Sequence, residues 1–174
     1  MDIESIIKEI PKFLDLEKNL KSSLETSALS KSQIWGSALA AAITCKEEKT
    51  YKTIYLEAKK NLSESEIKAS KEAASIMSMN NVYWRFWYLV DDKEYLDIPA
   101  NISTEIFTKH GIEEIDFECF TLAVSIINQC AGCLKVHSRK MLKLGFNKSQ
   151  IMAVIKIAAA VHSLAVSNFS GRLN

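Results

Sequence analysis

Residues 30–43 read SKSQIWGSALAAAI, and this stretch decides the fold class. Ser30, followed three residues later by Gln33, forms a capping box, in which each side chain satisfies a backbone N–H group of the other residue at a helix start. The apolar residues that follow lie at i, i+1, i+4, i+5, i+8 and i+9, as Ile34, Trp35, Ala38, Leu39, Ala42 and Ile43. This spacing predicts an amphipathic helix with one buried side.

Helix signals of the same kind recur along the chain. Ser63 with Glu66 predicts a second helix start, and Asn147 with Gln150 predicts a third. Gly145, with a lysine in the turn before it, marks a helix end. Only five glycines and two prolines punctuate the chain, and no alternating pattern typical of a β-strand is present. We therefore predict an all-α fold.

The composition is that of an ordinary globular protein. With 174 residues, of which 48% are hydrophobic and 25% charged, the chain suits one compact domain over residues 1–174. The 22 Lys and Arg residues nearly balance the 21 Asp and Glu residues, which gives a net charge of +1. This balance gives no reason to expect nucleic acid or an anionic membrane as a partner.

We predict no targeting peptide and no membrane span. The chain starts MDIE, with acids where a secretory signal carries bases and an apolar core. The longest uncharged stretch, residues 119–134, contains Asn128 and Gln129. It falls short of the roughly 20 apolar residues that a span needs. A cytoplasmic protein is therefore expected.

The cysteines indicate where to look for chemistry. Four cysteines are too few for a secreted disulfide scaffold, and in a reducing compartment a close pair is typical of redox catalysis or of a metal site. Residues 128–137 read NQCAGCLKVH, with a Cys-x-x-Cys pair at Cys130 and Cys133. The polar Asn128 and Gln129 interrupt an apolar run. We therefore interpret this stretch as a helix that ends near Asn128, a tight turn, and a new helix that starts around Cys130.

A cysteine pair in the first turn of a helix has two chemical consequences. Residues three apart in a helix are neighbours, so the sulfurs of Cys130 and Cys133 can come within bonding distance. The unpaired N–H groups and the positive end of the helix dipole favour a thiolate there. A thiolate is the form that attacks a peroxide or a disulfide.

An imidazole and a carboxylate complete the predicted site. His137 lies four residues after Cys133, on the same helix face. If the two helices form an antiparallel hairpin, Glu118 folds back to within about one turn of His137. The neighbours of Glu118 are mostly apolar, and a buried carboxylate needs a partner. We predict that Glu118 orients His137 and that His137 manages the thiol proton of Cys133.

Other interpretations stay open at this point. Cys130, Cys133 and His137, with Cys119 as a further candidate, could hold zinc in a structural or interaction module, although the chain has no second Cys-x-x-Cys motif. Cys45 and Cys119 lie in apolar helical runs and are expected to be small core residues. His162 lies on an apolar stripe, where a satisfied core histidine is the usual case.

A faint internal repeat divides the chain. Residues 61–67 align with residues 145–151, as two related helical units from an old duplication would, and as chance matching between alanine-rich helices would too. The same offset, 84 residues, aligns four residues of the first half with the candidate site. The residues Ile34, Lys46, Lys49 and Thr53 align with Glu118, Cys130, Cys133 and His137, so the first half lacks the chemistry. We therefore expect a non-catalytic half, residues 1–98, and a catalytic half, residues 99–174.

These motifs together resemble the alkyl hydroperoxide reductase D (AhpD) family, within the carboxymuconolactone decarboxylase-like superfamily. The carrying motif is Glu-x11-Cys-x2-Cys-x3-His, present as Glu118, Cys130, Cys133 and His137. The stretches QIWG at residues 33–36 and MNNVY at residues 79–83, followed by Arg85, also resemble that family. The resemblance implies an all-helical, trimeric enzyme that reduces alkyl hydroperoxides and regenerates the peroxiredoxin AhpC. It implies no bound cofactor. It also implies that the electrons come from the lipoyl group of a lipoylated acyltransferase, and that dihydrolipoamide dehydrogenase and NADH reduce this lipoyl group again.

The resemblance also implies a role for each site residue. Cys133 is the peroxidatic thiol and passes through a sulfenic acid. Cys130, expected to be the more exposed, is the resolving thiol and proton donor and forms the mixed disulfide with AhpC. Glu118 and His137 form the proton relay. The cycle leaves a Cys130–Cys133 disulfide that the lipoyl dithiol reduces.

This chain departs from the family at two positions. It carries Gly132 where a histidine is common between the cysteines, and Ser138 where a glutamate commonly follows the relay histidine. Loss of that imidazole predicts a slower or more alkaline peroxidase with a better retained disulfide-exchange role, to be tested with Gly132→His. We also consider that His162 replaces the missing imidazole.

Overall fold

A computed structural model describes residues 6, 13, 15–90 and 92–171 of the chain. These residues form helices and no strand, which confirms the all-α prediction. The first residues, on which the absence of a targeting peptide was predicted, lie outside the described part. The elements are α2 (Leu16–Leu24), α3 (Lys31–Cys45), α4 (Glu48–Asn61), α5 (Glu64–Val90), η1 (Lys93–Asp97), α6 (Ile106–Lys109), α7 (Glu114–Ile127), α8 (Ala131–Lys143) and α9 (Lys148–Ser170).

The predicted helix starts are confirmed. At the start of α3, the Ser30 N–H donates to Gln33 Oε1 at 2.9 Å and the Gln33 N–H donates to Ser30 Oγ at 3.1 Å. The start of α9 has the same reciprocal pair in Asn147 and Gln150. Each capping box satisfies backbone donors that a helix start otherwise leaves without a partner.

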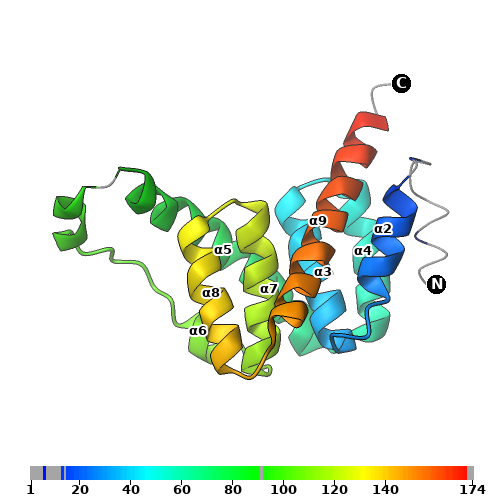
Figure 1. Ribbon diagram of the computed structural model, residues 1–174, viewed down its shortest axis with the longest axis horizontal. Helices are drawn as coiled ribbons and strands as arrows, with labels where there is room; N and C mark the ends of the chain where they lie inside the picture. Colours follow the sequence, from blue (N-terminus) through cyan, green and yellow to red (C-terminus); the bar gives the residue numbers. More distant parts are fainter. Residues whose placement is uncertain (1–5, 7–12, 14, 91, 172–174) are drawn as a thin grey trace.

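Helix α3 lies at the centre of the bundle and packs against α4, α5, α7 and α9 (Figure 1). The residues predicted to face the core are buried except Ile43, which is partly buried, and Ala38, Leu39 and Ala42 are fully inaccessible. Ser37 and Ala41, outside the predicted stripe, are buried as well, because the central α3 has neighbours on more than the one side that the spacing predicted. Gly36 lets α7 come close, because a Cβ atom at this position would overlap the ring of Phe120. The close α3–α7 contact fixes the position of α7, the first helix of the α7–α8 hairpin.

Helix α9 is long and apolar enough to cross a membrane, judged by length and composition alone. In this chain it packs against α2, α3, α4 and α7, and Ile157 and Leu164 are fully buried. Side chains packed on several neighbouring helices are typical of the core helix of a globular protein.

The end of α5 and the segment after it extend away from the bundle (Figure 1). We call residues 84–90 and 92–98 the arm. Phe86 of α5 and Tyr95 of η1 make an edge-to-face contact at 5.2 Å between ring centroids, which joins the two parts of the arm. Several of its large apolar side chains are exposed, among them Tyr88, Leu89, Val90 and Ile98. An apolar surface of this kind marks a place where another molecule binds.

Candidate active site

The site is built on the turn between α7 and α8. Helix α7 ends with Asn128 as its C-cap, Gln129 adopts the left-handed conformation with φ 56°, and Cys130 is the N-cap of α8. The Cys130 N–H donates to the Ser125 carbonyl at 3.1 Å, and Arg85 of α5 donates to the Asn128 carbonyl at 2.9 Å. The predicted break between two helices at residues 128–130 is therefore confirmed.

The two cysteines of the motif form a disulfide, with their Cα atoms 5.3 Å apart. The Cys130 sulfur also accepts a hydrogen bond from the Cys133 N–H at 3.3 Å. It thus occupies the position that a serine or aspartate oxygen takes at an ordinary helix start. An N–H donor and the helix dipole stabilise negative charge on this sulfur once the disulfide is reduced.

The expectation that Cys130 is the more exposed cysteine is wrong. Cys130 is 0% exposed and Cys133 is 6% exposed. The difference follows from the cap, because the Cys130 side chain turns back over the first turn of α8 to meet the Cys133 N–H group. Cys133 is the cysteine that lines the adjoining cavity.

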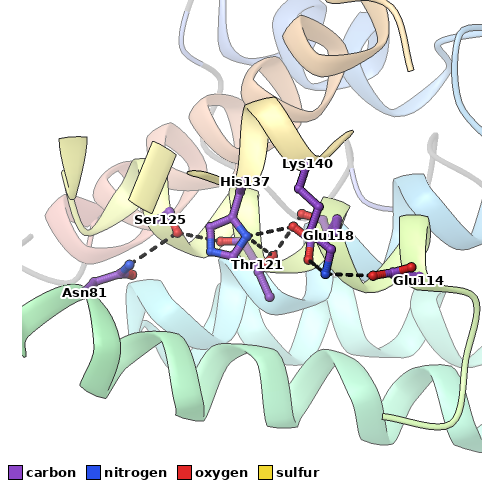
Figure 2. A network of polar contacts seen from close by, with 7 residues as sticks. All are labelled: Asn81, Glu114, Glu118, Thr121, Ser125, His137 and Lys140. Atoms are coloured by element: carbon purple, nitrogen blue, oxygen red, sulfur yellow. Dashed lines mark hydrogen bonds and ion pairs between the residues drawn. The ribbon is translucent and has the colours of Figure 1, made fainter. Parts of the chain in front are cut away.

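Glu118 and His137 meet across the α7–α8 hairpin, as the sequence predicts. Glu118 Oε2 lies 2.7 Å from His137 Nδ1, and both side chains are buried (Figure 2). A carboxylate only accepts hydrogen bonds, so Nδ1 carries the hydrogen and Nε2 is left to exchange protons. The Thr121 hydroxyl lies 3.2 Å from the same Nδ1 and donates to the Glu118 carbonyl. The roles of these residues in catalysis stay predictions.

Lys140 is a member of the site that sequence reasoning missed. Its Nζ lies 2.8 Å from Glu118 Oε1 and 2.8 Å from Glu114 Oε1. Burial alone raises the pKa of Glu118, but hydrogen bonds and charge from His137 and Lys140 outweigh burial, so this pKa is lowered. Burial likewise opposes the charge of Lys140, yet the two carboxylates raise the pKa of this amine. Lys140 lies three residues after His137, and that helical spacing was the available signal.

A chain of buried hydrogen bonds links this cluster to α5 (Figure 2). The Ser125 hydroxyl donates to the Thr121 carbonyl at 2.8 Å, and the Asn81 amide donates to Ser125 Oγ at 3.2 Å. Asn128 in turn donates to Asn81 Oδ1 at 3.0 Å. The network holds α5, α7 and the turn before Cys130 in one arrangement.

A cavity of about 450 Å³ adjoins Cys133. Its polar wall carries Glu118, His137 and Lys140, and its apolar wall carries Met77, Trp84, Tyr88, Phe107 and Val136. Helix α5 belongs to the half of the chain that was expected to lack the chemistry, and it supplies a large part of the apolar wall. The sulfur, the imidazole and the carboxylate all come from the other half.

Gly132 lies directly under the ring of Tyr88. A Cβ atom at Gly132 would overlap three ring carbons of that tyrosine. The space that a side chain between the two cysteines would occupy is therefore filled from α5. The Gly132→His substitution therefore adds an imidazole and also displaces the Tyr88 ring.

The remaining cysteines and His162 lie apart from this cavity. Cys45 Sγ is 3.6 Å from His162 Nδ1, and burial, followed by the charge of Glu47, raises the pKa of Cys45 to about 11. His162 is exposed and does not line the cavity, so it is neither the core histidine that was expected nor a replacement for an imidazole beside Gly132. Cys45, expected in the core, is only half-buried at the end of α3. Cys119 is fully buried, as expected of a core residue, and burial raises its thiol pKa well above the ordinary value.

The zinc alternative finds no support in the geometry. A structural zinc site needs four ligands that converge on one point. Within the described residues, no group of three or more His, Cys, Asp or Glu side chains is arranged to hold a metal ion. The two sulfurs of the motif are instead joined to each other.

Comparison with known proteins places this site in a family context. A sequence model described as the carboxymuconolactone decarboxylase family matches residues 93–169. The chain is 44% identical over 154 residues to a Coxiella burnetii protein named alkyl hydroperoxide reductase AhpD, with 87% of each chain covered. It is 39% identical over 166 residues to a Maricaulis maris protein of the same name, with 95% of this chain and 96% of that one covered. A Solibacter usitatus relative, also named AhpD, is 35% identical over 166 residues and covers 95% of this chain.

Proposed function

Because this chain belongs to the AhpD family, within the carboxymuconolactone decarboxylase family, we propose that it is an antioxidant alkyl hydroperoxide reductase. The relatives' name supports peroxide reduction as the general activity. The finer proposal is that a Cys130–Cys133 dithiol reduces hydroperoxides, regenerates the peroxiredoxin AhpC and is recharged by a dihydrolipoyl protein. The observation that carries it is the disulfide at the start of α8, beside a buried Glu118–His137 pair and an apolar cavity.

The oxidative half begins at Cys133, because this sulfur faces the cavity. His137 takes the thiol proton, and the thiolate attacks the terminal oxygen of the hydroperoxide. The O–O bond breaks, the sulfur becomes a sulfenic acid, and the leaving alkoxide receives the proton from His137 to become an alcohol. The Cys130 sulfur then attacks the sulfenic sulfur, the S–S bond forms, and hydroxide leaves with the Cys130 proton as water.

The reductive half returns two electrons to the disulfide. One thiolate of a lipoyl dithiol attacks a sulfur of the pair to give a mixed disulfide, and the second thiol displaces it, which leaves lipoyl disulfide and two protein thiols. Exchange with AhpC through Cys130 requires the turn at residues 128–130 to open, since Cys130 is fully buried in the oxidised protein. The lipoylated acyltransferase and dihydrolipoamide dehydrogenase are the proposed electron donors.

We also propose that the protein is a cytoplasmic homotrimer. The arm supports assembly, since Leu89 is 75% exposed and Ile98 is 57% exposed on a segment that extends from the bundle. A second copy of the chain offers an apolar surface of equal extent, and closed symmetric assembly would cover the arm of every copy. Light scattering of the full chain measures the mass directly, and a monomeric mass at micromolar concentration would contradict the trimer.

The test of the activity is peroxide turnover with lipoamide, dihydrolipoamide dehydrogenase and NADH. The unaltered protein is expected to oxidise NADH when an alkyl hydroperoxide is added. Cys130→Ser and Cys133→Ser are each expected to abolish lipoyl-dependent turnover, because neither retains a pair that can close a disulfide. Full turnover by either variant would contradict the dithiol cycle.

A further inference from the structure

A buried amide in the cavity holds an acceptor that no other described group satisfies. Asn80 of α5 is 5% exposed and lines the cavity with Cys133. Its Oδ1 has no hydrogen-bond partner within the described residues. Other buried side-chain oxygens that lack a partner among the described residues belong to Ser37, Glu72 and Asn168, and none of these residues lines the cavity. A buried acceptor without a donor opposes folding, and a ligand bound in the cavity that Asn80 shares with Cys133 would supply the missing donor.

Glu118 and Lys140, two charged groups that line the same cavity, are already engaged. Glu118 is bonded to His137 and to Lys140, and Lys140 also reaches Glu114. Oδ1 of Asn80 has no existing contact to break, but the atom is covered in the free protein, so a ligand reaches it only after the Asn80 amide turns toward the cavity. A ligand that satisfies it must bring a hydrogen-bond donor.

An alkyl hydroperoxide meets this requirement. The molecule R–O–O–H has one donor, its terminal O–H, and the terminal oxygen is the atom that a thiolate attacks. Its R group is apolar and matches the wall formed by Trp84, Tyr88 and Phe107. The cavity thus offers Asn80 for the O–H donor, Cys133 for the attacked oxygen and the aromatic side chains for the apolar tail.

We propose that Asn80 binds the hydroperoxide, with its Oδ1 accepting the hydrogen bond from the terminal O–H. This inference rests on the proposed peroxidase function. Asn80 holds the terminal oxygen toward Cys133 while the tail lies along the aromatic side chains. Cys133 then attacks the held oxygen, the O–O bond breaks, and the alcohol leaves after it receives a proton from His137.

The neighbouring asparagine provides a natural contrast. Asn81 is fully buried, but its amide donates to Ser125 and its carbonyl accepts from Asn128. Asn81 does not line the cavity. Adjacent residues of the same type on one helix therefore divide between a structural role and a ligand-binding role.

The experiment compares Asn80→Leu and Asn80→Ala with Asn81→Leu. Each reduced protein is mixed with cumene hydroperoxide, and loss of the two active-site thiols is followed by maleimide trapping and mass spectrometry. Loss of one ligand hydrogen bond is expected to lower the second-order rate constant of both Asn80 variants by about 5- to 30-fold. The Tm of Asn80→Leu is expected to equal or exceed that of the unaltered protein, because an unsatisfied acceptor is removed, whereas Asn81→Leu is expected to lower Tm.

Reduction of the oxidised protein by dithiothreitol separates the outcomes, since that reaction involves no hydroperoxide. Its rate is expected to be unchanged in both Asn80 variants. Unaltered thiol loss with cumene hydroperoxide in these variants overturns the role of Asn80 alone. A fall in both Tm and the dithiothreitol rate assigns Asn80 to structure and also overturns it. Failure of the unaltered protein to react with the hydroperoxide overturns the proposed function together with this inference.

Discussion

Two cysteine–histidine pairs lie in this chain, and their cysteines occupy opposite ends of helices. Cys45 is the last residue of α3 and lies near the exposed His162. Cys130, in contrast, caps the start of α8, and Cys133 follows in the first turn of this helix. The same helix carries the buried His137. A helix C-terminus disfavours a thiolate and a helix N-terminus favours one. Burial and the charge of Glu47 raise the pKa of Cys45, and its helix end acts in the same direction. A nearby imidazole is therefore not enough to make a thiol reactive, because burial, charge and helix position also set its chemistry.

The largest expected difference between the two regions is in thiol reactivity. Reduced protein at pH 7 is treated briefly with iodoacetamide, and labelling of each cysteine is counted by mass spectrometry. Because burial and Glu47 raise the pKa of Cys45 to about 11, only about one molecule in 10⁴ carries the Cys45 thiolate at pH 7. Cys133 is expected to react at least about 100-fold faster.

Unfolded protein in urea serves as the control, because burial and helix ends no longer distinguish the cysteines there. The labelling rates are expected to converge in urea to within a few fold. Equal rates for Cys45 and Cys133 in the folded protein would contradict the assignment of different chemistry to the two regions.

The second test removes the carboxylate of Glu118, which contacts the imidazole of His137. Glu118→Gln keeps the size of the side chain but no longer fixes the hydrogen on His137 Nδ1, since an amide can donate or accept. Hydroperoxide reduction is expected to slow by about 10- to 100-fold. Stopped-flow measurement of thiol loss in the reduced protein gives this rate.

Glu114→Gln is the matched control, because Glu114 also contacts Lys140 but does not touch His137. It is expected to retain the rate of the unaltered protein to within about twofold. A Glu118→Gln variant as fast as Glu114→Gln would show that the Glu118–His137 contact is structural.

Local patterns predicted the helices and half of the site. A capping box such as Ser30 with Gln33 is encoded within four residues, so the helix starts could be read directly. The Glu118–His137 contact followed from one short turn that forces α7 and α8 to run antiparallel. Both features depend on residues close in sequence.

Lys140 was missed although its helical spacing from His137 was an available signal. The other parts that the sequence did not predict depend on packing between distant segments or on one rotamer. Tyr88 and Asn80 reach the cavity from α5, and no periodic pattern relates them to Cys133. The burial of Cys130 depends on its side chain turning back to cap α8, which residue type alone does not fix.

The third test measures how closely the start of α8 is packed against α5. Gly132→Ala adds a methyl group where the Tyr88 ring lies, and such overpacking is expected to lower the free energy of unfolding by about 1–3 kcal/mol. The double variant with Tyr88→Ala is expected to recover part of this loss. Urea denaturation of the four proteins gives the coupling between the two positions.

This coupling also decides how the Gly132→His hypothesis should be tested. The pH–rate profile of Gly132→His is informative only beside Tyr88→Ala and the double variant, since the single substitution must move the tyrosine. Additive effects of Gly132→Ala and Tyr88→Ala on stability would contradict the contact.

The smallest expected effect concerns Lys140 and the pH dependence of stability. The pKa of Glu118 in the folded protein lies below its ordinary value of 4.5, so ionised Glu118 stabilises the fold. That stabilisation is complete above the pKa of the unfolded chain and is lost as the pH falls through the lowered folded-state pKa. Lys140→Met removes one of the two side chains that lower the pKa of Glu118. The variant is expected to lose less than about 1 kcal/mol at pH 7, because the Lys140 side chain is 35% exposed.

On acidification the two proteins are expected to converge. Once Glu118 is protonated, Lys140 no longer has a charge on Glu118 to attract, so the difference in urea midpoint between the unaltered protein and Lys140→Met shrinks below about pH 4.5. Lys140→Arg keeps the cation and is expected to follow the unaltered protein at every pH. A constant difference from pH 7 down to pH 3 would mean that Lys140 contributes by packing, and that His137 alone accounts for the ionised state of Glu118.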